Sequence, residues 1–211
     1  MNLDEISDGL RRRFDETMEA RERALPAARR AIRACANAIR ALHREEWDEA
    51  HRLMDQAKAA IDDGLVAVRD HPDIRFAGYL QDAQKEYAEA RITEAVVTGA
   101  GRLPTPEEIG VEDAPYLNGM AEAIGEARRH ILDLLRHGHV DRGEAILSAM
   151  DDMYYVLVSM DYPDAITMNL RRTTDVARSL IEKTRGDLSI AIVQRQLRDA
   201  LDRHAKDILG Q

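Results

Sequence analysis

Cysteine and aromatic residues are scarce in this chain of 211 residues, and both scarcities reduce the number of fold classes to consider. The single cysteine, Cys35, excludes a disulfide within the chain, and its place in an apolar-periodic stretch favours a small buried side chain. Aromatic residues make up only 4% of the sequence, whereas alanine, leucine, arginine and acidic residues are abundant. This balance predicts an all-α fold, because strands are rich in aromatic and β-branched residues.

Long hydrophobic runs are missing as well. Residues 1–16 have no apolar run like that of a signal peptide, and no window approaches the length needed to span a bilayer. We therefore expect no membrane partner and a cytoplasmic location. A chain of 211 residues can bury one sizeable core, and nothing in the composition marks a second, so a single helical domain over residues 1–211 is predicted.

Lysine is the scarce basic residue. The chain has 30 basic residues, of which only four are lysines, against 39 acidic residues, which gives a formal net charge of −9. Binding to a nucleic-acid backbone is driven by clustered positive charge that releases counterions. The net acidity therefore argues against general electrostatic attraction, and any RNA site must be local.

Apolar residues recur with helical spacing in six or seven segments. In the first, residues 3–42, a narrow stripe repeats every seven residues: Met18, Leu25, Ile32 and Ile39. Such a stripe predicts a long helix that faces a partner. Pro26 lies inside the pattern and predicts a kink or a local split near Leu25, because proline removes a backbone donor.

The remaining segments are delimited by turn residues. A second helix over 47–68 is expected to form an antiparallel hairpin with the first. Further helical segments are predicted at about 73–98, 114–136, 141–160 and 165–209, and an interruption of the last near Gly186 stays open. The glycine- and proline-rich stretch 99–110 predicts a loop, in which Thr105 can cap one short helical turn.

Two pairs of glutamates lie on predicted helix faces among small residues. Glu86 and Glu89 are three apart, and Glu122 and Glu126 are four apart, so each pair shares one helix face. Glycines and alanines in 119–125 would let another helix come close. If the two helices face each other, four carboxylates form the oxygen-rich site that Mg²⁺ prefers, and such a metal can generate hydroxide and polarise a phosphodiester.

Spacing alone does not establish a metal site. Among 39 acidic residues many pairs fall three or four apart by chance, and a solvated helix face is the commoner outcome. His130, His137 and His139 suggest a different metal site. A di-iron bundle, however, needs Glu-x-x-His pairs on two helices, and no glutamate in this chain has a histidine three residues later. A ferritin-like site is therefore disfavoured.

Both glutamate pairs lie in runs that resemble the translin family. Residues 84–90 (QKEYAEA) resemble the Glu-Tyr-x-Glu-Ala motif of translin-associated protein X, the catalytic branch of that family. Residues 116–126 (YLNGMAEAIGE) resemble its Tyr-Leu-x-Gly-x-Ala-acid segment, which is followed by Gly-Glu. The likeness extends over nearly the whole chain, including the long first helix, the glycine-rich loop and the long C-terminal helix.

The resemblance implies a fold and a site. The fold is a single α-helical bundle of about seven helices that assembles into a closed, hollow homo-oligomer, typically an octamer, with RNA inside. The acidic residues of the family's endoribonuclease site correspond to Glu86, Glu89, Glu122 and Glu126. Glu122 stands where the catalytic branch has aspartate, so its side chain is one methylene longer, whereas translin itself lacks this acidic set.

The resemblance also implies an activity. We expect a magnesium-dependent endoribonuclease, a hydrolase that acts on single-stranded RNA with Mg²⁺ bound by the four glutamates. Lys85 and Arg129, beside the acidic motifs, are the candidate RNA contacts. Two other interpretations stay open: a non-catalytic shell that binds single-stranded nucleic acid like translin, and a helical scaffold for another protein with no RNA role.

Overall fold

The computed structural model describes residues 2–209, with side chains through residue 206, and this part of the chain is helical without any strand. The helices of this part are α1 (Leu3–His43), α2 (Trp47–Ala67), α3 (Pro72–Arg75), α4 (Tyr79–Thr98), α5 (Pro106–Ile109), α6 (Asp113–Arg136), α7 (Val140–Ser159), α8 (Asp164–Thr167) and α9 (Leu170–Leu209). Six are long, and α3, α5 and α8 are single turns of four residues. The all-α prediction is confirmed.

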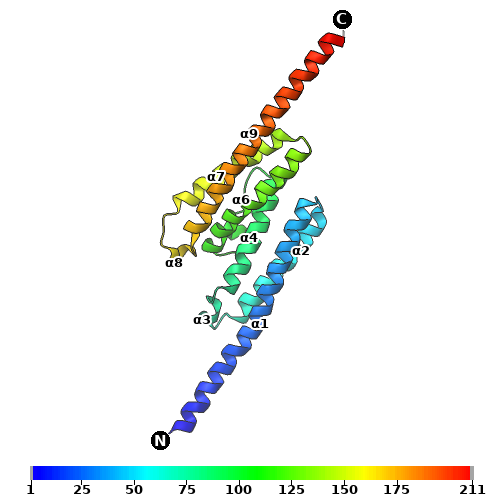
Figure 1. Cartoon of the computed structure of the whole chain (residues 1–211). Coiled ribbons are helices and arrows are strands. Elements are labelled where there is room, and N and C mark those ends of the chain that lie inside the picture. Colours follow the sequence, from blue (N-terminus) through cyan, green and yellow to red (C-terminus); the bar gives the residue numbers. More distant parts are fainter. Residues whose placement is uncertain (1, 210–211) are drawn as a thin grey trace.

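The long helices form three layers in one bundle. The α1–α2 hairpin lies on one side, α4 and α6 lie in the middle, and α7 and α9 cover the other side (Figure 1). One continuous apolar core runs through all three layers. The middle helix α4 is covered over most of its surface, with buried residues that include Leu80, Tyr87, Ile92 and Val97. The α4–α6 contact is therefore the centre of the molecule.

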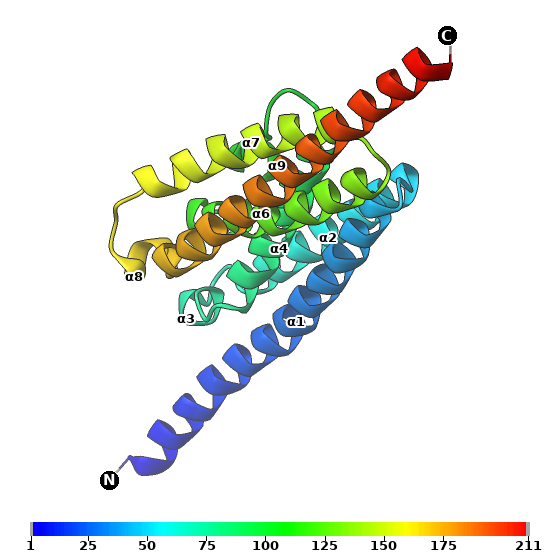
Figure 2. The ribbon, with the colours of Figure 1, turned by 45° about the horizontal axis from the view of Figure 1, so that its top comes forward.

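The first and last helices extend beyond the bundle at opposite ends (Figures 1 and 2). The heptad stripe of α1 is divided accordingly. Its second half, with Cys35 and Ile39, is buried in the bundle, whereas Met18 at its start is exposed. The free end of α1 adds further exposed apolar side chains on the same face: Leu3, Ile6, Leu10 and Phe14. No helix among those described is long and apolar enough to cross a membrane.

The local split predicted as one outcome at Pro26 does not occur, nor does the interruption near Gly186 that the sequence left open. Helix α1 runs through Pro26 without a break, and α9 runs through Gly186. Proline removes one hydrogen-bond donor, but Ala24, Ala27 and Ala28 on either side of Pro26 are buried against the bundle and keep both parts of α1 in one helix. The predicted local split near Leu25 is therefore wrong.

The segment expected over 73–98 is divided instead. The single turn α3 and the long helix α4 are separated at Gly78, which has φ +101°, a backbone conformation that glycine adopts without strain. The predicted turn after Thr105 is present as α5. Thr105 and Glu108 there form a reciprocal capping box, which satisfies two backbone donors at the start of the turn.

Candidate metal centre

Helices α4 and α6 come into close contact at Gly119. A Cβ atom at this position would lie 2.6 Å from the carbonyl oxygen of Lys85 and 2.8 Å from the Cβ of Ala88. Any side chain here would push the two helices apart. Because Glu89 follows Ala88 and Glu122 lies one turn after Gly119, this contact brings carboxylates of both helices together. The predicted role of small residues is confirmed at Gly119.

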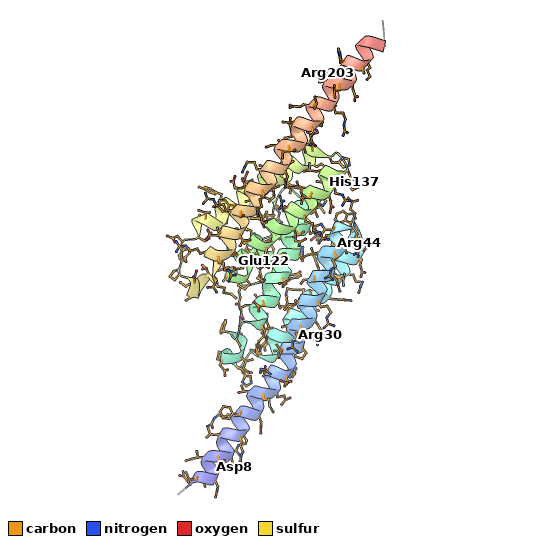
Figure 3. All side chains as sticks on the ribbon, in the orientation of Figure 1. Asp8, Arg30, Arg44, Glu122, His137 and Arg203 are labelled. Atoms are coloured by element: carbon orange, nitrogen blue, oxygen red, sulfur yellow. The ribbon has the colours of Figure 1, made fainter. Side chains whose placement is uncertain are left out.

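Three of the four predicted glutamates converge at the α4–α6 contact. One carboxylate oxygen each from Glu86, Glu89 and Glu122 lies within 4.8 Å of the other two; we call these three residues the carboxylate triad. Glu122 lies near the middle of the bundle in Figure 3. Glu89 is the most enclosed, at 9% exposed. A set of carboxylate oxygens of this kind suits a hard divalent cation such as Mg²⁺.

The protonation of Glu89 shows how the triad responds to a cation. Burial raises the pKa of Glu89 to about 8, and the negative charges of Glu86, Glu122 and Glu126 add to the rise. Such a group retains its proton at neutral pH unless a positive charge replaces that proton. Binding of a divalent cation would release it, since a carboxylate must be deprotonated to act as a ligand. The triad therefore fits a cation electrostatically as well as in ligand type.

Lys85 already supplies one positive charge to this cluster. Its Nζ donates hydrogen bonds of 2.8 and 2.7 Å to the two carboxylate oxygens of Glu122 and lies 3.2 Å from Oε1 of Glu86. Burial opposes the charge of Lys85, but the hydrogen bonds and charge of Glu122 outweigh burial and raise the pKa of the ammonium group. The predicted RNA contact at Lys85 would require this ammonium group to leave Glu122.

The fourth predicted glutamate, Glu126, is bonded to a residue from another helix. Its Oε2 lies 2.5 Å from Nε2 of His43, the last residue of α1, and 3.8 Å from Nη1 of Arg129. The hydrogen bond from His43 lowers the pKa of Glu126, and the charge of Glu126 still contributes to the raised pKa of Glu89. Glu126 is therefore a neighbour of the carboxylate triad rather than a member of it.

Sequence reasoning did not identify His43 as part of the site. The sequence feature that could have identified His43 is its spacing from Cys35 and Ile39, which precede it by eight and four residues on the buried face of α1. Burial raises the pKa of the Cys35 thiol, and the negative charges of Glu86 and Glu89 add to this effect, so this face of α1 points at the site. Arg129, the other candidate RNA contact, has a side chain that is 56% exposed.

Comparisons with known proteins place this arrangement in a wider context. No family model matches the chain. An uncharacterised protein of Methanocaldococcus jannaschii is 33% identical over 129 residues, a match that covers 61% of this chain and 57% of that protein. The chain thus spans little more than half the length of this curated relative.

Solved structures match over almost the full chain. AfC3PO is 31% identical and covers 93% of this chain. The TM-score is 0.83 for its complex with duplex RNA and 0.81 for a crystal structure of AfC3PO, and this chain covers 99% and 100% of these two structures. Apo-NeC3PO shares the fold at a TM-score of 0.78 and 20% identity, with coverage of 87% of this chain and 96% of that one. The bundle is therefore of the C3PO class. The chain belongs to the translin family.

Proposed function

We propose that this protein binds RNA and hydrolyses it as a magnesium-dependent endoribonuclease. The observation that carries the proposal is the convergence of Glu86, Glu89 and Glu122 from two helices within 4.8 Å. Mg²⁺ bound there would polarise a phosphodiester and lower the pKa of an attacking water molecule. The family supports the RNA part, because AfC3PO, at 31% identity, forms a complex with duplex RNA.

The residues of the site have separable roles in this proposal. Glu86 and Glu122 have side chains that are 25% and 34% exposed, so a cation held by them would be accessible to a substrate phosphate, whereas Glu89 forms the enclosed side of the triad. Glu126 is proposed as the fourth ligand, adjacent to the triad. Lys85 neutralises part of the acidic charge before a divalent cation arrives.

The substrate proposed from the motifs is single-stranded RNA. The net charge of −9 disfavours broad attraction to a phosphate backbone, so contact depends on individual basic groups near the triad, of which the exposed Arg129 is one. Since the AfC3PO complex contains duplex RNA, both forms of RNA belong in the assay.

We further propose that the protein works as a hollow homo-oligomer, with an octamer as the expected form. Apolar side chains that a monomer would leave in water support self-association. They lie on the free end of α1, including Leu10 and Phe14, and along the distal part of α9, at Ile190, Val193, Leu197 and Leu201.

A second candidate function is an RNA-binding shell without catalysis. The observation that favours it is the bond between Lys85 and Glu122, which partly satisfies the acidic cluster with a side chain of the protein itself. In that case the glutamates would stabilise the α4–α6 contact, and RNA would be bound but remain intact.

An assay of RNA cleavage separates the two functions. Labelled single-stranded and duplex RNAs are incubated with the protein in Mg²⁺ or in EDTA, and bound and cleaved RNA are measured in parallel. We expect Mg²⁺-dependent cleavage that is lost in Glu89→Gln and Glu122→Gln. The matched control is Glu94→Gln, because Glu94 lies on α4 outside the triad, paired with His51 and Arg91.

Each outcome of this assay has a defined meaning. Binding without cleavage supports the shell, and cleavage that persists in both triad variants removes the proposed site. Absence of RNA binding even at low salt would exclude both functions and favour a protein scaffold.

A further inference from the structure

A buried histidine from α1 is bonded to the fourth glutamate of the site. The side chain of His43 is only 4% exposed, and its Nε2 lies 2.5 Å from Oε2 of Glu126 across 83 residues of sequence. A buried polar ring of this kind lowers the stability of the fold unless it is hydrogen-bonded. The contact is therefore a specific link between α1 and α6.

The surroundings of the His43 ring define the direction of this hydrogen bond. Within the described part of the chain, Nδ1 of His43 is buried and has no partner. A ring N–H at Nδ1 would be an unsatisfied buried donor, so we assign the proton to Nε2, which donates to Glu126. The ring of His130 lies beside that of His43, with centroids 6.3 Å apart, but makes no hydrogen bond to it among the described residues.

The same hydrogen bond determines which carboxylate oxygen of Glu126 is free. Oε2 accepts from His43, while Oε1 has no hydrogen bond among the described residues. Among the described residues, the other oppositely charged group paired with Glu126 is Arg129, at 3.8 Å. Without His43, Glu126 would have one weak partner and several rotamers, and the negative charges of the triad would favour those that point away from it.

We infer that His43 is a positioning residue that fixes Glu126 beside the carboxylate triad, where the negative charge of Glu126 adds to the attraction for the divalent cation. This inference rests on the proposed metal-binding function. Hydrogen-bonded partners that orient a ligating carboxylate typically contribute about 10- to 100-fold to metal affinity or activity. Helix α1 would thereby join α4 and α6 as the third helix of the metal centre.

The test measures cation affinity directly on the full-length protein, with Mn²⁺ as the probe and free Mn²⁺ quantified by electron paramagnetic resonance. His43→Leu removes the donor, and we expect affinity to fall by about 10- to 100-fold. His43→Gln retains an N–H donor on a side chain of similar reach and should restore most of the affinity. Glu126→Gln should weaken binding as much as His43→Leu, and the double variant should lose little more, because both changes remove one interaction.

Two further variants keep the test decisive. His130→Leu is the control, since His130 is 6% exposed and adjacent to His43 but has no hydrogen bond to Glu126; it should bind Mn²⁺ normally. If His43→Leu does not fold, His43→Asn replaces it, because asparagine is polar but too short to reach Glu126. The His43→Asn variant should bind Mn²⁺ as weakly as expected for His43→Leu.

The outcomes distinguish this inference from the proposed function. Normal Mn²⁺ affinity in a folded His43→Leu or His43→Asn variant would overturn the inference alone. An equal loss in His130→Leu, or no rescue by His43→Gln, would also overturn it, because the effect would then reflect packing. If the wild-type protein binds no Mn²⁺, the proposed metal centre and the positioning role are both excluded.

Discussion

Lys85 donates two hydrogen bonds to Glu122, so a cationic side chain of α4 neutralises a carboxylate of α6 at the centre of the bundle. A divalent cation that uses Glu122 must compete with an ammonium group that is already bonded to both carboxylate oxygens.

Replacing this lysine should tighten cation binding. A partly buried ion pair contributes about 1 kcal/mol, so Lys85→Met should raise Mn²⁺ affinity by about fivefold. Lys58→Met is the matched control, because Lys58 pairs with Asp62 on α2 at 2.6 Å, away from the triad. Isothermal titration calorimetry with both variants gives the comparison. Weaker binding in Lys85→Met would show that the lysine supports the site instead of competing for it.

A methyl group at Gly119 should separate the two central helices. Its Cβ would lie 2.6 Å from a backbone oxygen of α4, so Gly119→Ala should lower the free energy of unfolding by about 1–3 kcal/mol and weaken Mn²⁺ binding. Gly125→Ala is the control. In the described part of the chain its Cβ would meet only Leu180, at 3.7 Å, and alanine favours the helix by up to about 1 kcal/mol. Urea unfolding should therefore move the two variants in opposite directions, and equal stability would contradict the close contact.

The raised pKa of Glu89 predicts a stability that depends on pH. The folded-state pKa of about 8 lies above that of an ordinary glutamate, 4.5, so the folded protein binds more protons between these values. The contribution of Glu89 is therefore most favourable at acid pH and is lost as pH rises through about 8, by on the order of 2 kcal/mol between pH 6 and 9. Denaturant unfolding across this range should show the loss in the wild type and a flatter profile in Glu89→Gln.

Added Mg²⁺ supplies an independent check on the same group. It should restore wild-type stability mainly at pH 8–9, where Glu89 is ionised, and should have little effect on Glu89→Gln. If wild type and Glu89→Gln have the same pH profile, Glu89 does not carry the raised pKa.

The exposed face of α1 should mediate self-association. Phe14 is 69% exposed and Leu10 is 42% exposed on one face of the free end, so Leu10→Asp with Phe14→Asp should reduce the assembly to smaller species. Arg12→Asp is the control, because Arg12 is exposed and lies on the other side of the helix. Light scattering after size-exclusion chromatography measures the mass. An unchanged mass in the double variant would exclude this face as an interface.

Local sequence rules were sufficient for much of the fold. Helical periodicity located the six long helices, and the capping residue Thr105 identified a single turn within the loop. The local split at Pro26 does not form, and the rule that predicts it considers only backbone donors. Burial of the adjacent alanines is a tertiary effect that opposes the break, and it cannot be read from the helix alone.

The site was predicted less completely than the fold. Spacing and family resemblance identified both glutamate pairs, and Gly119 indicated that two helices could meet closely. Neither signal shows which residue of a distant helix will contact a carboxylate. His43 lies 83 residues from Glu126, and only the packing of α1 brings them together. The bond between Lys85 and Glu122 depends on the register of α4 against α6, which spacing within one helix does not specify.

The free ends of α1 and α9 point in opposite directions from the bundle and both bear uncovered apolar side chains (Figure 1). A subunit with one interaction surface can bind one neighbour, whereas a subunit with such a surface at each end can bind two. An assembly of such subunits stops growing only when the rotation from each subunit to the next brings the last one into contact with the first. Otherwise the assembly continues as a filament. The angle at which these two helices leave the bundle thus governs whether such a polymer closes.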